Sequence, residues 1–168
     1  YTRAELEALA DAILTTDTRI KLAGCTLVVG GAEVTIAAFA KGSGMIAPEL
    51  ATMLAFIATD AHVGHGTLAQ MVRDVADVSF NRVTVDGDTS TNDTVLVMAS
   101  GALAGARIDG GAAGEAFVAA LTTVCEKLAW MITEITKAQL LAVHAGRVKD
   151  RRKLEPAHVS MLKRNNAA

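Results

Sequence analysis

The sequence has few cysteines, few aromatic residues and no apolar run long enough to cross a membrane. Cys25 and Cys125 are two cysteines in a chain of 168 residues, which is too few for a disulfide framework, and both suit buried strand or helix positions. The longest apolar run falls well short of the roughly 20 residues that a transmembrane helix needs. No basic segment followed by an apolar segment opens the chain, as in a signal peptide. We therefore expect a cytoplasmic protein with no membrane partner.

What the sequence has instead is a large share of small apolar residues. Hydrophobic residues make up 51% of the chain and aromatic residues 4%, so alanine, valine, leucine and glycine supply most of the apolar volume. A chain of this length can bury a real core, and its composition is not that of a disordered protein. We expect one small-residue core of tightly packed helices and strands.

The net charge of −2 conceals an uneven distribution of charge along the chain. Residues 1–146 contain nine Lys and Arg against sixteen Asp and Glu, whereas residues 147–168 contain seven against two. The basic run at 149–153 lacks interleaved aromatic residues for base stacking, so we expect no nucleic-acid partner. A solvated helix end or tail explains this run better, and Pro156 is expected to stop regular structure there.

Hydrophobic periodicity and turn residues predict a mixture of helices and strands. Thr2-Arg3-Ala4-Glu5 has the pattern of a capping box, and the helical spacing that follows should end near Thr15. Gly30 and Gly31 join two β-branched runs and permit a tight hairpin. The expected strands are 25–29, 33–37, 53–58, 82–85 and 94–99, and the expected helices are 67–80 and 115–133, with 138–148 able to prolong the second. These elements belong to the α/β (α+β) class, a layered sheet with packed helices.

Residues 41–60, KGSGMIAPELATMLAFIATD, contain the most informative pattern in the chain. A glycine-rich turn and a proline lead into the pair Ala51-Thr52, and an apolar run follows directly. If the bond between these two residues is cut, Thr52 gains a free α-amine that titrates at about pH 8. That amine lies beside the hydroxyl of the same residue and can act as its general base. The pattern fits an N-terminal nucleophile that awaits release, and it also fits a loop entering an ordinary core strand.

Two further segments favour the nucleophile. Residues 12–21, AILTTDTRIK, and 85–101, VDGDTSTNDTVLVMASG, flank residues 41–60 in the order found in one enzyme family. Across residues 8–132 the chain resembles the ornithine acetyltransferase family, the bifunctional glutamate N-acetyltransferases of arginine biosynthesis. The resemblance implies part of an N-terminal-nucleophile-like, self-processing fold. In that family the precursor cuts itself at an Ala-Thr bond, and the new N-terminal threonine is acetylated during turnover.

The resemblance also implies roles for individual residues. Thr52 would be the nucleophile and Ala51-Thr52 the cleavage bond, while Lys41 and Thr18 would contact the substrate. The implied substrates are N-acetylornithine and glutamate, with acetyl-CoA as a further acetyl donor and no other cofactor. The implied assembly is an oligomer of cleaved chains.

The polar segment 86–93 has two interpretations. Its first residues resemble the opening of a calcium loop, but the glycine and the glutamate that such a loop needs at its sixth and twelfth positions are absent, so we reject calcium. By resemblance the segment packs around the nucleophile, where Asn92 and Asp93 would orient Thr52 through hydrogen bonds. These side chains equally suit a polar turn between two strands.

Two departures from the family pattern affect the expected activity. The family's oxyanion-hole Thr-Gly pair lies upstream of the region that this chain matches, and its substrate-binding glutamate lies downstream in an Asp-Gly-Glu-Gly stretch. Here residues 133–137 read Thr-Glu-Ile-Thr-Lys. We expect an acetyltransferase-like core at 1–133, the central third of such an enzyme, and an atypical helical and basic tail at 134–168. Such a chain on its own should be weakly active or inactive.

Two other classes of function stay open. One is a non-catalytic, truncated or engineered module that keeps the motifs of the fold without a complete site. The other is a self-processing threonine amidohydrolase, in which water accepts the acyl group. A metal centre is not expected, because His62 and His65 have no third ligand nearby. The Gly42-Ser43-Gly44 turn is too short for dinucleotide binding and better suited to a sharp backbone bend.

Overall fold

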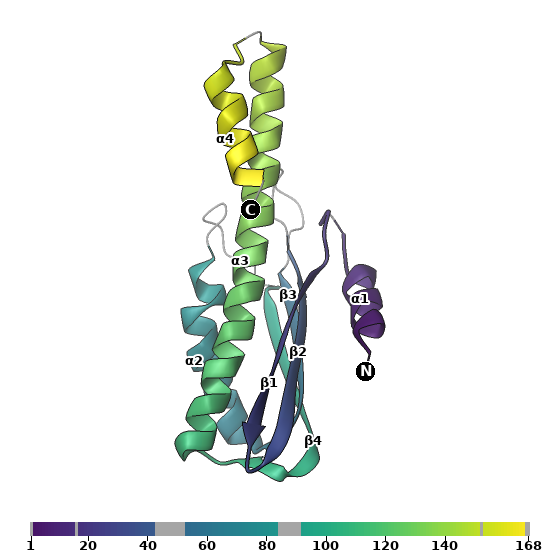
Figure 1. Cartoon of the computed structure of the whole chain (residues 1–168), viewed down its shortest axis with the longest axis vertical. Coiled ribbons are helices and arrows are strands. Elements are labelled where there is room, and N and C mark those ends of the chain that lie inside the picture. The colour runs from purple at the N-terminus through teal and green to yellow at the C-terminus, as the bar shows by residue number, and fades with distance from the viewer. Residues whose placement is uncertain (1, 16, 43–52, 84–91, 152, 167–168) are drawn as a thin grey trace.

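Four strands form one mixed sheet with helices packed against both of its faces (Figure 1). The computed structural model describes residues 2–15, 17–42, 53–83, 92–151 and 153–166. Within these ranges the helices are α1 (Arg3–Ala12), α2 (His65–Val78), α3 (Gly111–Asp150) and α4 (Pro156–Asn166), and the strands are β1 (Lys21–Val29), β2 (Ala32–Lys41), β3 (Leu54–Val63) and β4 (Thr94–Ile108). The predicted class, an α/β layered sheet with packed helices, is confirmed.

The strands lie in the order β1-β2-β3-β4. The hairpin between β1 and β2 turns at Gly30 (φ 60°) and Gly31 (φ 82°), which confirms the turn predicted from these two glycines. β2 and β3 are also antiparallel, whereas β3 and β4 are parallel. Parallel strands need a crossover connection, and α2 lies in that connection.

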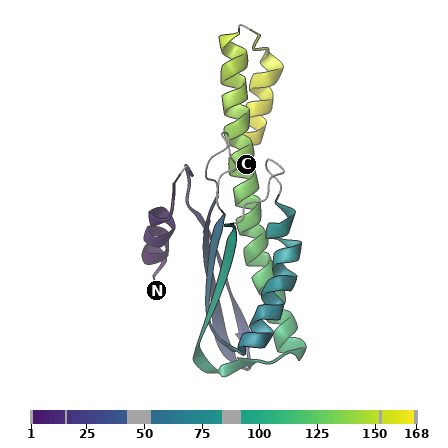
Figure 2. The same ribbon diagram turned by 180° about the vertical axis from the view of Figure 1, so that it is seen from behind.

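The core lies between the sheet and α3, with α2 beside α3 on the same face (Figure 2). Alanines on the inward face of the sheet let the helix approach closely, as the composition predicted. The residues that form the centre of this core are Val34, Ile36, Ala38, Ala40, Ala55, Ile57, Phe117, Leu121, Val124 and Leu128.

α1 lies on the opposite side of the sheet from α3 (Figure 2). Its N-terminus closes with the predicted capping box: the Glu5 N–H donates to Thr2 Oγ1 at 3.3 Å, and the Thr2 N–H donates to Glu5 Oε2 at 2.7 Å. The N–H and the hydroxyl of Thr2 both donate to the Glu5 carboxylate, and these hydrogen bonds lower the pKa of Glu5. The helix ends at Ala12, slightly before the expected end near Thr15.

Two predictions from the sequence are wrong. Residues 82–85 were expected to form a strand, but Phe80–Arg82 form a 3-10 turn, and residues 84–85 lie outside the described ranges. This turn directly follows α2 and carries the ring of Phe80 into the core, where it is buried, so Arg82 is not available for a strand. Pro156 was expected to stop regular structure but begins α4. Proline suits the first position of a helix, because the N–H that it lacks would have no helical partner there.

α3 is one helix of 40 residues that continues past the end of the sheet (Figure 1). The predicted helix at 115–133 and its extension at 138–148 are therefore a single element. α4 folds back beside the extension, and its described side chains are exposed or half-buried. By length and hydropathy α3 also satisfies the requirements of a membrane span. However, side chains such as Phe117 and Leu128 are buried in the core, as they are in a core helix of a globular protein.

Candidate active site

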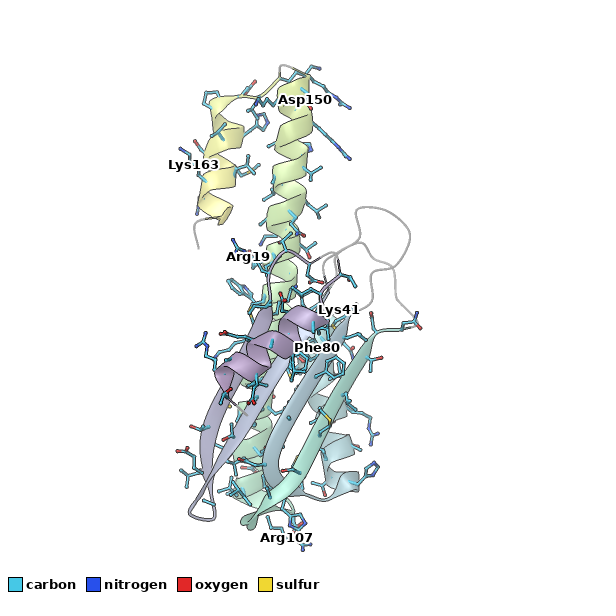
Figure 3. All side chains as sticks on the ribbon, turned by 90° about the vertical axis from the view of Figure 1, so that its right-hand side faces the viewer. Arg19, Lys41, Phe80, Arg107, Asp150 and Lys163 are labelled. Atoms are coloured by element: carbon cyan, nitrogen blue, oxygen red, sulfur yellow. The ribbon has the colours of Figure 1, made fainter. Side chains whose placement is uncertain are left out.

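The predicted site residues that the structure describes lie near the end of the sheet where β2 stops and where β3 and β4 begin. Lys41 is the last residue of β2 and pairs with Leu54, the first residue of β3, which in turn pairs with Thr94, the first residue of β4. Figure 3 shows Lys41 at this end of the sheet. Residues 43–52, which include Ala51 and Thr52, lie outside the described ranges. The chain leaves the sheet for this segment, and returns from it, at the same end.

The residues on either side of the segment, Gly42 and Met53, lie so close together that a side chain at position 42 would touch Met53. Gly42 has a φ of 146°, which residues other than glycine rarely adopt, and a Cβ at this position would lie 3.5 Å from Met53 Cα. The carbonyl of Met53 accepts a hydrogen bond of 2.9 Å from the N–H of Thr94. Because of the φ of Gly42, a glycine is needed at the point where the chain turns away from β2.

Asp93 holds the backbone next to the predicted nucleophile. Its Oδ1 accepts a hydrogen bond of 2.8 Å from the N–H of Met53, the residue that follows Thr52 in the chain. The carbonyl of Asn92 accepts a bond of 3.1 Å from the Thr94 hydroxyl. Because Thr52 lies outside the described ranges, the role of Asn92 and Asp93 in orienting it stays a prediction. The structure does show that the Asp93 carboxylate accepts a hydrogen bond from the N–H of Met53, the first backbone N–H after Thr52.

Thr18 and Lys41, the predicted substrate contacts, reach this region from different elements. Lys41 is half-buried, and its Nζ donates to Thr15 Oγ1 at 3.5 Å. Thr18 is exposed in the connection between α1 and β1, and its Oγ1 accepts a hydrogen bond of 3.0 Å from Gln139 Nε2. An ammonium group and a hydroxyl on one open end of the fold are suited to a carboxylate and an amide of a small substrate.

Gln139 also lies in this region, and no motif in the sequence pointed to it. It lies in the segment assigned to an atypical tail, but α3 passes residue 133 without a break. The extension of α3 therefore reaches the connection that contains Thr18. The helical spacing at 138–148 predicted the extension itself. It carried no information about which loop the extension would meet, because that contact depends on tertiary packing across more than a hundred residues.

The described ranges offer no rival site with an evident chemistry. Within them, no group of three or more His, Cys, Asp or Glu side chains is placed to hold a metal ion. His62 lies in β3, and His65 begins α2. A groove of about 790 Å³ opens beside α3 around the exposed Trp130, but none of the described site residues lines it.

The two cysteines are free thiols that are poorly suited to act as nucleophiles. Burial raises the pKa of Cys125 to about 12, and it also raises the pKa of the half-buried Cys25. At pH 8 we expect iodoacetamide to alkylate Cys125 about 10²-fold more slowly in the folded protein than in urea, because little thiolate forms. Peptide mass spectrometry over time measures both rates. Equal rates in the folded and unfolded chain would contradict the burial of Cys125.

Comparison with known proteins assigns the chain to a family. The family model described as the ArgJ family matches residues 1–144. The chain belongs to the ArgJ family. The match confirms the resemblance seen in the three sequence motifs, and its range includes every predicted site residue: Thr18, Lys41, Ala51, Thr52, Asn92 and Asp93.

Curated relatives are identical to this chain at about half of the aligned positions. The arginine biosynthesis bifunctional protein ArgJ of Geobacillus kaustophilus is 51% identical over 132 residues, which are 78% of this chain and 32% of that protein. The protein of the same name from Symbiobacterium thermophilum is 54% identical over 121 residues, which are 71% of this chain and 30% of that protein. The chain thus spans about a third of the length of these curated relatives.

The chain is also similar to a solved structure of a protein with the same name. It is the crystal structure of the arginine biosynthesis bifunctional protein ArgJ from Bacillus halodurans, which is 44% identical. The alignment covers 48% of this chain and 38% of that one, with a TM-score of 0.46.

Proposed function

We propose that the chain takes part in acetyl transfer from N-acetylornithine to glutamate, with Thr52 as the nucleophile after self-cleavage at Ala51-Thr52. The observation that carries this proposal is the ArgJ family match over residues 1–144, a range that contains the cleavage bond. The relatives are named as bifunctional proteins of arginine biosynthesis. The convergence of the other predicted site residues at one end of the sheet supports it.

Self-cleavage is proposed to begin with attack of Thr52 Oγ on the carbonyl carbon of Ala51. The C–N bond breaks, the hydroxyl proton moves to the released amine, and the acyl group becomes an ester of the threonine. Water then hydrolyses that ester, which leaves a carboxylate on Ala51 and restores the hydroxyl of Thr52. Asp93 supports this step, since its 2.8 Å bond to the N–H of Met53 fixes the backbone directly after the nucleophile.

In the transfer reaction the α-amine of Thr52 acts as general base for the hydroxyl of the same residue. Oγ attacks the acetyl carbonyl of N-acetylornithine, and the amine passes the hydroxyl proton to the leaving nitrogen, so that ornithine departs and an acetyl ester remains. The amine of glutamate then attacks the carbonyl of this ester, the bond to Thr52 Oγ breaks, the α-amine of Thr52 passes the proton of the attacking nitrogen to Oγ, and N-acetylglutamate departs. An α-amine with a pKa of about 7.7–8.0 suits both proton transfers near neutral pH.

The remaining roles follow from charge and hydrogen-bonding capacity. The Lys41 ammonium binds a substrate carboxylate as a point charge, and the Thr18 hydroxyl binds the amide. Acetyl-CoA is proposed as a further acetyl donor, without another cofactor. We propose a cytoplasmic location, an oligomer of cleaved chains, and no nucleic-acid or membrane partner.

The 168-residue polypeptide alone is expected to turn over slowly. The tetrahedral intermediate of acyl transfer needs donors to its oxyanion, and loss of one donor typically lowers the rate by about 10²–10³. No residue of this sequence matches the Thr-Gly pair that supplies such donors in the family. Release of ornithine over time in the presence of glutamate measures the turnover. A rate of about 1 s⁻¹ or more from this polypeptide alone, within the usual range of complete enzymes, would contradict this expectation.

A single-turnover experiment separates the proposed function from its two rivals. Purified chain is incubated for hours with N-acetylornithine, quenched in acid, digested and mapped by mass spectrometry. Acetyl transfer predicts an acetyl group on Thr52 that glutamate removes as N-acetylglutamate. An amidohydrolase would instead release acetate equally well without glutamate, and a non-catalytic module would never carry acetyl. Either of these last two results would overturn the proposal.

A further inference from the structure

An ion pair that the proposed chemistry does not use is buried beside the site. Lys21 Nζ donates to Asp17 Oδ1, and the two side chains are 0% and 1% exposed. Removing two charges from water costs several kcal/mol for each ion, so a buried ion pair is a poor source of stability. The other contacts of the pair indicate a role other than stabilisation.

The same carboxylate reaches the start of the segment that contains the cleavage bond. Asp17 Oδ1 accepts a second hydrogen bond, of 3.0 Å, from the N–H of Gly42. Gly42 directly follows Lys41 and has the left-handed φ of 146° at which the chain turns away from the sheet. Asp17 thereby ties the connection that contains Thr18 to the point where the chain departs toward Ala51-Thr52.

Lys21 in turn fixes the carboxylate. It is the first residue of β1 and pairs with Ala40 of β2, so its backbone is held by the sheet. Its ammonium group donates to Asp17 Oδ1 and so orients the carboxylate, and hydrogen bonds between charged partners are stronger than neutral ones. The position of Gly42 relative to the sheet is thus set by a carboxylate that is anchored on β1.

A second carboxylate holds the other side of the same segment. Asp93 Oδ1 accepts a hydrogen bond of 2.8 Å from the N–H of Met53, and a Cβ at Gly42 would lie 3.5 Å from Met53 Cα. One aspartate therefore receives a backbone N–H immediately before residues 43–52, and another receives one immediately after them. Of the two, Asp17 is the buried one and the one with a dedicated counter-charge.

We propose that Asp17 and Lys21 are positioning residues for the reaction at Thr52. They hold Gly42, the residue that follows Lys41 and directly precedes residues 43–52, which contain the cleavage bond. This inference rests on the proposed function and adds to it two residues to which the sequence analysis gave no role. It predicts that cleavage depends on the side-chain oxygen of residue 17 that accepts the Gly42 N–H. Removal of the charges of Asp17 and Lys21 together should leave the cleavage rate unchanged as long as that oxygen is kept.

Two double variants test this directly. Asp17→Asn/Lys21→Met removes both charges but keeps an oxygen that accepts the Gly42 N–H. Asp17→Leu/Lys21→Met also removes both charges, keeps a branched side chain of similar reach, and offers no acceptor. Urea unfolding reports whether each variant folds, NMR-detected amide exchange reports the Gly42 bond, and intact-mass time courses report the cleavage rate. Exchange of the Gly42 amide in the wild type adds a measurement that needs no variant to fold.

The wild type and the Asp17→Asn/Lys21→Met variant should protect the Gly42 amide and cleave at similar rates. The Asp17→Leu/Lys21→Met variant should remain folded in urea unfolding, but it should exchange that amide about tenfold faster and cleave about tenfold more slowly, which is the loss expected for one hydrogen bond. Free exchange of Gly42 in the wild type, or equal cleavage by the two variants, would overturn the inference. If the wild type is never cut, the proposed function fails, and the exchange rates alone then decide whether Asp17 holds Gly42.

Discussion

Replacement of Thr52 by alanine is expected to leave the chain as one uncut species of 168 residues under conditions in which the wild type is cut. The reason is chemical, because alanine has no hydroxyl to attack the preceding carbonyl. The thiol of Cys125 is a poor substitute, since burial raises its pKa to about 12 and little thiolate forms. The same variant should also carry no acetyl group after incubation with N-acetylornithine. Intact-mass spectrometry detects both outcomes.

Thr52→Ser is the matched control for this experiment. Serine keeps the hydroxyl and the α-amine that cleavage would release, so cleavage should persist. Cleavage of Thr52→Ala between residues 51 and 52 would show that another nucleophile or a contaminating protease is responsible. Cleavage of neither variant, with a wild type that is cut, would show that the methyl group of threonine is required as well as its hydroxyl.

Replacement of Lys21 by methionine is expected to lower the free energy of unfolding by about 3–5 kcal/mol, because it leaves the carboxylate of Asp17 buried without its counter-charge. Both side chains are excluded from water, so solvent cannot compensate for the lost ammonium group. Urea unfolding followed by circular dichroism measures the effect as a shift of the midpoint.

The double variant Asp17→Asn/Lys21→Met provides the control. It removes both charges together and should recover most of the lost stability, since neutral replacements of a buried ion pair are often tolerated. A single variant as stable as the wild type would mean that Asp17 and Lys21 are accessible to water. That result would also remove the physical basis for a positioning role of the pair.

Much of the fold follows from local patterns in the sequence. The capping box at Thr2 and Glu5, the hairpin at Gly30 and Gly31, and the spacing of the core residues in α3 are set by residues close together in the chain. Arg82 and Val83 did not form the start of the expected strand, because burial of Phe80 in the 3-10 turn outweighed the local β propensity. Pro156 was misjudged because proline ends a helix from within but suits its first position.

The candidate site could be predicted only in part. Thr18, Lys41 and Asp93 were found through motifs that resemble those of one family, not through any contact that the sequence reveals. The buried partnership of Asp17 with Lys21 and Gly42 joins three segments, and its geometry appears only when β1 and β2 pair. The bond from Gln139 to Thr18 spans 121 positions, which no local pattern encodes.

The central claim is that Thr52 becomes an N-terminal residue through self-cleavage. The most direct test is an intact-mass time course of the purified wild-type chain, followed by sequencing of the new N-terminus. The account predicts the loss of the full-length species and the appearance of two fragments, of 51 and 117 residues, the second of which begins at Thr52. A single uncut species after prolonged incubation, from protein shown by circular dichroism to be folded, would contradict it.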